Sequence, residues 1–244
     1  MMSDVSIDVI PLKKVNLKGA TVIDGFPSEL FTNSIASQCF LHSIDTQLIA
    51  ILDSPIFNQL TIVKNEIPQF PVRIYANEKL NLAIFISDVK IEPTVYHIIG
   101  KTILRWAIDN ECKLIISASS IVESNSVEKN FSDYTIYGIG NTDETRIKLR
   151  NSNITIFGNG SISGLPAILL NQGSINGLSV MVLIVKVLEG VPDYRAAAEL
   201  SKAIIGLVPG IKCDISLLIN QAEIIENDIK RIRNQNSYNV NLYG

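Results

Sequence analysis

The chain has 244 residues, 47% of them hydrophobic, and a formal net charge of −3. A chain of this length and composition can bury a sizeable core, either as one large domain or as two small ones. The slight negative charge gives no reason to expect a nucleic-acid partner or an anionic membrane surface, and the longest apolar run, Leu178 to Val185, is too short to span a bilayer.

The first half of the chain alternates short β-rich runs with helical patterns. Ala20–Phe26 predicts a strand that turns at Asp24-Gly25, and Ser28 is a candidate N-cap for the helix that follows. Pro93 suits the first position of an amphipathic helix that runs through Ile108. Further strands are predicted over residues 46–52, 70–77, 80–87 and 112–119, the second and third of them paired as a hairpin.

The second half continues this alternation. Strands are predicted over residues 134–140, from 153 into a Gly-rich turn, and over 178–185, with helices over 142–150, 165–172 and 191–207. The last of these helices has Pro192 at its start and Asp193 in its first turn. The run Leu178–Val185 is continuously apolar, as expected for a central parallel strand covered on both faces. The pattern predicts an α/β fold, a three-layer α/β/α sandwich over residues 1–210.

The C-terminal segment has a different pattern. From Ile211 onward, apolar residues recur every three or four positions, at Ile215, Leu218, Ala222, Ile225, Ile229 and Ile232. This is a heptad seam, narrower than the apolar face of an ordinary core helix. It predicts a helix over residues 211–233 that packs either on its own domain or on another copy of the chain. Residues 234–244 are polar and aperiodic, which predicts a flexible tail that extends up to roughly 36–40 Å.

The three cysteines, Cys39, Cys112 and Cys213, are far apart and form no CxxC pair. This pattern is typical of a reducing compartment and predicts three buried thiols, without a disulfide framework or a zinc site. We therefore expect a cytoplasmic protein.

Two glycine-containing motifs invite a nucleotide or anion interpretation. Gly100-Lys101-Thr102 resembles the end of a phosphate-binding P-loop, but Val95 stands where that loop needs a glycine, and the segment lies inside a predicted helix. The run Gly158–Gly164 follows a strand and opens a helix, whose N-terminus could hold an anion. Its spacing misses the dinucleotide-binding fingerprint by one residue, so we favour a tight strand-to-helix crossing.

Candidate catalytic side chains are sparse. His42 and His97 lie in predicted helices among apolar neighbours, and a pair formed by His97 and Cys112 has no local support. Carboxylates near predicted strand ends, where α/β enzymes place them, are Asp53, Asp88 and Asp133. No paired-carboxylate arrangement can be derived from their spacing. We expect no catalytic residue, no metal and no cofactor.

Five segments in order resemble the proteasome assembly chaperone family and its archaeal relatives. They are "TVIDGFPSEL", "ILRWAIDN", "GNGSISGLPAILLNQG", "VPDYRAAAEL" and "INQAEIIENDI". In one respect the chain departs from the family, which usually has glycine where Ser28 follows Gly-Phe-Pro. The resemblance implies a core related to the phosphorylase/hydrolase α/β/α fold, without the active-site residues of its enzyme relatives.

The resemblance also implies a function and a site. Family members assist assembly of the proteasome α-ring, and several archaeal members resemble ATP-independent activators that end in a hydrophobic-Tyr-any tripeptide. Leu242, Tyr243 and Gly244 match that tripeptide. In the family, the two side chains enter pockets between adjacent α subunits of the core particle, and the terminal carboxylate pairs with a pocket lysine.

Three hypotheses follow from these observations. The first is a non-enzymatic, homo-oligomeric proteasome assembly chaperone or activator that binds through the tripeptide. The second is a phosphorylase-like or nucleotide-binding enzyme with Gly158–Gly164 as its anion site. The third is a scaffold that acts through its globular face, with the tail as an auxiliary.

Overall fold

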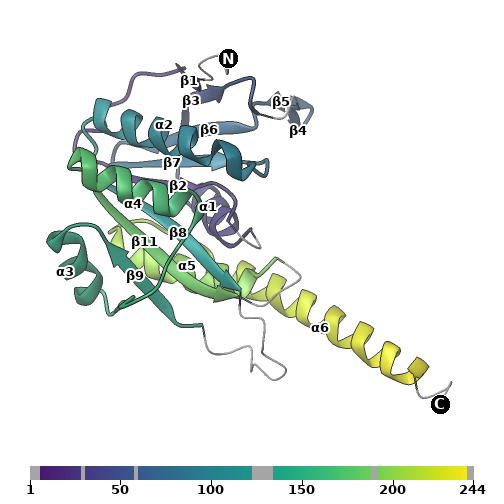
Figure 1. Cartoon of the computed structure of the whole chain (residues 1–244). Coiled ribbons are helices and arrows are strands. Elements are labelled where there is room, and N and C mark those ends of the chain that lie inside the picture. Colours follow the sequence, from purple (N-terminus) through teal and green to yellow (C-terminus); the bar gives the residue numbers. More distant parts are fainter. Residues whose placement is uncertain (1–5, 29–30, 58–59, 123–133, 188–191, 241–244) are drawn as a thin grey trace.

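The computed structural model describes residues 6–28, 31–57, 60–122, 134–187 and 192–240, with side chains up to residue 227 except that of Val122. Its centre is a mixed sheet of nine strands in the order β1-β3-β6-β7-β2-β8-β11-β9-β10 (Figure 1). Four central strands run parallel to one another. They are β7 (Leu82–Ser87), β2 (Thr21–Gly25), β8 (Leu114–Val122) and β11 (Ser179–Val187). Their residues are almost wholly buried, which explains the continuous apolar runs in the sequence.

Antiparallel strands extend the sheet on both sides. On one side β6 (Val72–Asn77), β3 (Gln47–Asp53) and β1 (Asp8–Pro11) follow β7 outward. On the other side β9 (Ile136–Gly140) pairs antiparallel with β11, and β10 (Thr155–Ile156) pairs parallel with β9. The predicted hairpin is β6–β7. A separate two-stranded sheet, β4 (Ile62–Lys64) with β5 (Ile67–Gln69), was not predicted.

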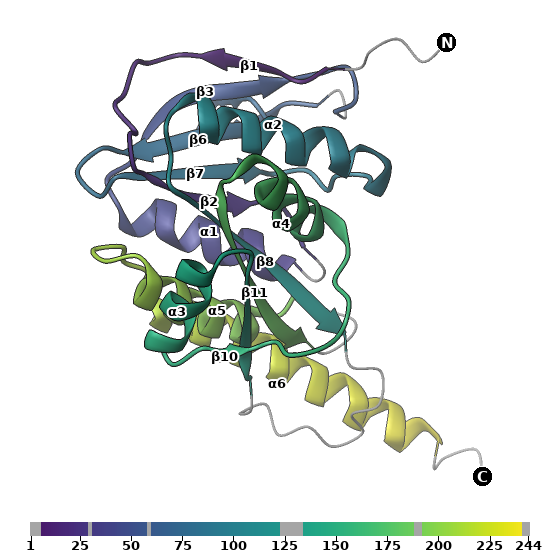
Figure 2. The same ribbon diagram turned by 60° about the vertical axis from the view of Figure 1, so that its left-hand side comes forward.

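Helices cover both faces of the sheet, so the predicted α/β/α layering is confirmed (Figure 2). Adjacent residues of one strand show this: Val22 packs in one core cluster and Ile23 in the other. The first cluster lies under α2 (Tyr96–Asp109) and α4 (Gly164–Asn176), and the second under α1 (Thr32–Ser43) and α5 (Tyr194–Leu207). The short α3 (Asp143–Asn151) contributes Leu149 to the second cluster, and the long α6 (Ile215–Val240) follows α5.

Two helix starts differ from the sequence prediction. The first helix begins at Thr32, later than predicted, and the Ser28 hydroxyl accepts a bond from the Asn33 backbone at 3.2 Å. Asp193 is the N-cap of α5 and not part of its first turn, because its carboxylate accepts the Ala196 N–H at 2.8 Å.

The last helix is also shifted relative to the prediction. It begins at Ile215 and not at Ile211, which is buried in the segment before it. It ends at Val240, so residues 234–240, expected to belong to a flexible tail, are helical. None of the described helices is both long enough and apolar enough to cross a membrane.

Candidate functional site

The helix base, by which we mean residues 213–226, comprises the two residues before α6 and the first turns of that helix. It lies against α1 and α5 on one face of the sheet. Leu218 is buried in a small cluster with Ala198 of α5 and Cys39 of α1, and Ala222 is buried one turn further along. Ile215 is half-buried in the same cluster, and Ile225 is half-buried further along the helix. The first part of the predicted seam therefore packs on its own domain.

The rest of the seam and the predicted tripeptide cannot be placed in the same way. The side chains of Ile229 and Ile232 lie outside the described residues, as do Leu242, Tyr243 and Gly244. The backbone of α6 is described to Val240, and Figures 1 and 2 both show it extending past the body of the domain.

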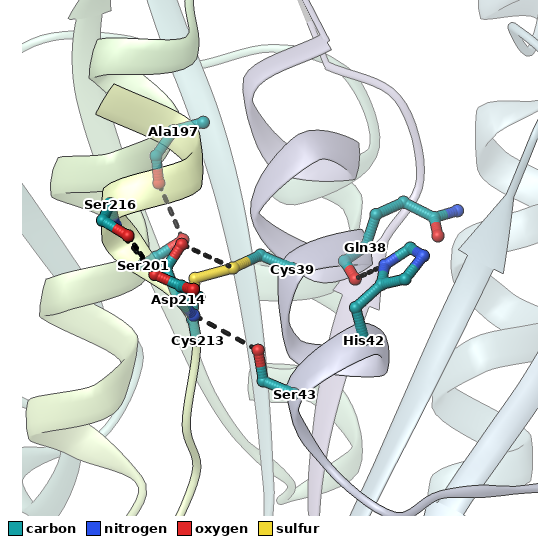
Figure 3. Close-up of a disulfide and its surroundings, with 9 residues drawn as sticks. All are labelled: Gln38, Cys39, His42, Ser43, Ala197, Ser201, Cys213, Asp214 and Ser216. Carbon is teal, nitrogen blue, oxygen red and sulfur yellow. Dashed lines mark hydrogen bonds between the residues drawn. A yellow bond between two sulfur atoms is a disulfide. The ribbon is translucent and has the colours of Figure 1, made fainter. Parts of the chain in front are cut away.

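A disulfide joins the helix base to α1 (Figure 3). It links Cys39 to Cys213, which are 174 positions apart in the sequence and have their Cα atoms 5.3 Å apart. The prediction of three free thiols is therefore wrong for this pair, because the fold brings together two cysteines that the spacing gave no reason to connect. Cys112 is a buried free thiol, and burial raises its pKa to about 11, which disfavours the reactive thiolate.

Polar contacts on either side of the disulfide hold the same segment. The backbone N–H of Asp214 donates to the Ser43 hydroxyl at 3.2 Å, and the Asp214 carboxylate accepts the N–H of Ser216 at 3.1 Å, which caps the start of α6. Further along, Arg195 of α5 donates two bonds to the carboxylate of Glu226, at 2.8 and 3.1 Å. These contacts fix the direction in which α6 leaves the domain.

An apolar groove of about 470 Å³ lies beside the helix base. Its walls come from α1, α6 and the loops near them, and include Phe31, Ile35, Leu217 and Leu218. Phe31 is 44% exposed and adopts a φ of 59°, which is unfavourable for a bulky side chain. Leu217 is also exposed, so the groove has large apolar side chains at its surface.

Comparison with known proteins identifies the family. The sequence model of the PAC2 family matches residues 22–233. The chain belongs to the PAC2 family. An uncharacterized protein of Methanocaldococcus jannaschii is 27% identical over 230 residues, which is 94% of this chain and 92% of that protein.

Solved structures of two Pyrococcus furiosus proteins resemble this PAC2 domain. PbaA, described as an archaeal homolog of proteasome-assembly chaperone, has a TM-score of 0.82 and 25% identity over 97% of this chain and 95% of its own. PbaB, described as an archaeal proteasome activator, has a TM-score of 0.78 and 16% identity over 93% of this chain and 99% of its own. At 16% identity, the similarity to PbaB shows a shared fold only.

Those candidate catalytic residues that the structure describes do not come together in this PAC2 domain. His42 and His97 are exposed on different helices, α1 and α2. Asp53 is exposed at the end of β3, and Asp133 lies outside the described residues. Asp88 forms ion pairs with Arg73 and Lys64. Within the described ranges, no group of three or more histidine, cysteine or acidic side chains is arranged to hold a metal ion.

The two glycine motifs have structural roles in this PAC2 domain, the first in helix packing and the second in a turn. Gly100 lies inside α2, where a Cβ atom would come within 2.6 Å of Ile168 on α4, so the glycine permits close contact between the two helices. Gly158–Gly164 connects β10 to α4, as predicted, and Gly164 has a φ of 77° at the start of that helix.

Sequence reasoning missed Asp24, the most deeply buried carboxylate among the described residues. Its side chain accepts bonds from the Ser117 hydroxyl at 2.6 Å and from the Phe26 N–H at 3.0 Å. Burial raises the pKa of Asp24 to about 6, although both hydrogen bonds lower it. The Asp-Gly pair resembles an ordinary turn in the sequence, and only its position within β2 reveals the burial. The residue braces the connection from β2 to α1.

Proposed function

We propose that this chain is a non-enzymatic proteasome assembly chaperone or activator, and that α6 presents the tripeptide Leu242-Tyr243-Gly244 to the α-ring of the core particle. Membership of the PAC2 family and likeness to PbaA and PbaB support the general role. The observation that carries the mechanism is a helix of 26 residues, fixed at its base and extending past the domain toward the C-terminal end of the chain. At about 1.5 Å per residue it spans about 39 Å.

The tripeptide has the chemistry for a pocket between subunits. Leu242 offers apolar surface, and Tyr243 offers a large rigid ring with a hydroxyl that needs a partner. In this proposal, the carboxylate of Gly244 is a charge-assisted acceptor for a pocket lysine. These groups together supply a gross stabilisation of roughly 5–8 kcal/mol, and association costs at least about 4 kcal/mol. One tripeptide should therefore bind with millimolar affinity or weaker.

Because a single tripeptide binds weakly, the proposal needs several copies of the chain in one assembly. Copies that share a ring present their tripeptides together and bind by avidity. Exposed apolar side chains on α6 support self-association: Leu217 and Ile224 are one heptad apart and both more than half exposed. The half-buried Ile225 and the two isoleucines beyond it, Ile229 and Ile232, are further candidates for this contact.

The test is a pull-down of purified proteasome core particle by the full chain and by three variants. Removal of residues 242–244 and Tyr243→Ala should each reduce capture at least about tenfold, as expected when each of several cooperating sites is weakened. Tyr238→Ala is the matched control, because it removes a tyrosine of α6 outside the tripeptide, and should leave capture unchanged. Equal capture by the truncated and full chains would refute tail docking, and partial capture would favour a scaffold that binds through its globular face.

Two further measurements separate this proposal from its alternatives. Mass measurement in solution should find an oligomer, and a strict monomer that still bound the core particle tightly would contradict the avidity argument. A thermal shift with phosphate or nucleotide that persisted in the Tyr243→Ala variant would instead favour an enzyme with an anion site at Gly158–Gly164.

A further inference from the structure

A second groove, which we call the edge groove, lies at the β1 edge of the sheet, far from the helix base in the sheet order. It has a volume of about 810 Å³ and lies between α2 on one side and β1 with β3 on the other. Its apolar lining comes from both sides and comprises Ile7, Val9, Pro11, Val15, Ile49, Ala50, Ile98 and Trp106. Because β1 is the terminal strand, the groove opens at the border of the sheet.

The rim of the edge groove is strongly basic. Lys13 and Lys14 follow β1, and Lys101 and Arg105 lie one turn apart on α2, all four of them exposed. Asp109 is the one carboxylate in the lining. The whole chain has a net charge of −3, so the electrostatic potential at this rim is opposite in sign to that expected from the net charge of the protein.

These cations have few partners within the described residues. Lys13 donates a long bond of 3.5 Å to the side-chain amide of Gln47. The ion pairs of the described residues include none formed by Lys14, Lys101 or Arg105. Basic side chains elsewhere in the domain do form such pairs, for example Lys18 with Glu111 and Lys202 with Glu199. The rim cations thus remain available for an external anion.

The shape of the groove favours an elongated ligand. On α2, His97, Lys101 and Arg105 follow one another at intervals of four residues, and so lie along one line on the helix. Two such intervals cover about 12 Å of helix, which is the length of about four residues of extended peptide. An apolar floor below a row of cations is complementary to a segment in which acidic and apolar side chains alternate, since successive side chains of an extended chain point to opposite sides.

From these features we propose that the edge groove binds an extended acidic peptide segment of a partner protein, with apolar side chains on the floor and carboxylates on the rim. A nucleic acid fits less well. Trp106 is the one large aromatic ring of the lining, and it also packs against Phe85 of the core, with the ring centroids 5.1 Å apart. The groove therefore has no series of aromatic side chains on which successive bases could stack. The lining of the edge groove includes no residue of the tripeptide, and the proposal stands whether or not the tail docks on the proteasome.

The test measures fluorescence anisotropy of a labelled peptide of alternating glutamate and leucine, eight residues long, with the full-length protein at low salt. We expect saturable binding that weakens as salt is added. Replacing leucine by serine in the peptide should weaken binding about tenfold, since the apolar floor then loses its ligand, and replacing glutamate by lysine should abolish it.

Protein variants locate the site. Lys101→Glu combined with Arg105→Glu should weaken binding of the glutamate–leucine peptide at least about tenfold, because it places two like charges beside the carboxylates. Lys79→Glu is the control for charge reversal outside the groove: Lys79 is exposed in the turn between β6 and β7 and should change binding less than about twofold. Tyr243→Ala should bind the peptide as the unmodified chain does.

Several outcomes would overturn the proposal. They are absence of saturable binding up to millimolar peptide, equal loss in the Lys79→Glu control, and equal affinity for the serine-containing peptide. Displacement of the peptide by an oligothymidylate or by inorganic phosphate at comparable concentration would also overturn it, because the groove would then attract any anion. Circular dichroism of each variant checks that the fold is retained.

Discussion

The helix base and the edge groove use charged and polar side chains in opposite ways. At the helix base, Arg195 is paired with Glu226, Asp214 caps α6, and a disulfide joins α6 to α1. At the edge groove, Lys101 and Arg105 are exposed and form none of the ion pairs found among the described residues. The bonded side chains at the helix base stabilise the position of α6. The exposed cations at the edge groove contribute little to the stability of the fold and are available to bind a ligand. Stability measurements can therefore distinguish the two regions.

The largest effect on stability is expected from the disulfide. Replacing both Cys39 and Cys213 by serine should lower the free energy of unfolding by about 3–5 kcal/mol, because 174 positions separate the two residues and the cross-link restricts the unfolded chain. Urea denaturation with and without reductant measures it. Reductant should destabilise the unmodified chain and leave the variant unchanged, and a variant as stable as the unmodified chain would mean that this pair does not hold the helix base.

The next effect is a pH dependence centred on Asp24, which braces the segment before α1. Its pKa is about 6 in the folded chain against 3.8 unperturbed, so the folded state keeps a proton that the unfolded state releases between these values. Stability should consequently fall as pH rises from about 4 to 6 and level off above that, by roughly 3 kcal/mol in total.

Urea denaturation from pH 4 to pH 8 checks the Asp24 prediction. Asp24→Asn cannot titrate and should flatten this part of the stability profile. A profile with the same slope in the variant would assign the proton to another group.

A smaller effect is expected from the ion pair between α5 and α6. A double-mutant cycle with Arg195→Ala and Glu226→Ala should give a coupling energy of about 1–2 kcal/mol, since the two side chains are mostly buried and share two hydrogen bonds. The pair Lys202 and Glu199 is the matched control on the exposed side of α5 and should give less than about 0.5 kcal/mol. Equal coupling energies in the two pairs would mean that the ion pair at the helix base stabilises the fold no more than an exposed ion pair does.

The smallest effect on the free energy of unfolding is expected from a substitution at the edge groove. Lys101→Glu should change the free energy of unfolding by less than about 0.5 kcal/mol, because the side chain is exposed and none of the described ion pairs includes it. Thermal unfolding at two salt concentrations measures the change. A loss as large as that at the helix base would indicate that the rim cations hold the fold together, and would contradict their role in ligand binding.

The sequence predicted the layered fold well where periodicity was strong. The apolar runs over β6, β7 and β11 identified these strands, because burial on both faces of the sheet leaves an unambiguous composition. It missed β1, whose four residues include Pro11 and carry almost no pattern, although this strand forms one side of the edge groove. Short edge strands are specified by their neighbours in the sheet and not by their own residues.

The candidate site was predicted only in part, for a related reason. The spacing from Ile215 to Ile225 identified a helix with an apolar seam, but could not tell whether the domain or another copy covers it; Leu218 and Ala222 turn out to pack on the domain. The link between Cys39 and Cys213 depends on two distant segments meeting, which no local pattern encodes. The lysines of the basic rim likewise come from separate elements, the segment after β1 and α2, so no local pattern predicts that they lie close together.

The attachment of α6 at one end has a mechanical consequence. Beyond Glu226, the last residue with a described contact to α5, the helix continues for about 21 Å to Val240, at about 1.5 Å per residue. Over that length, a tilt of about 10° at the base displaces the far end by roughly 4 Å, about the spacing of neighbouring Cα atoms. The resistance to tilting that the contacts around Cys213 and Arg195 provide therefore determines how accurately the far end of α6 is positioned.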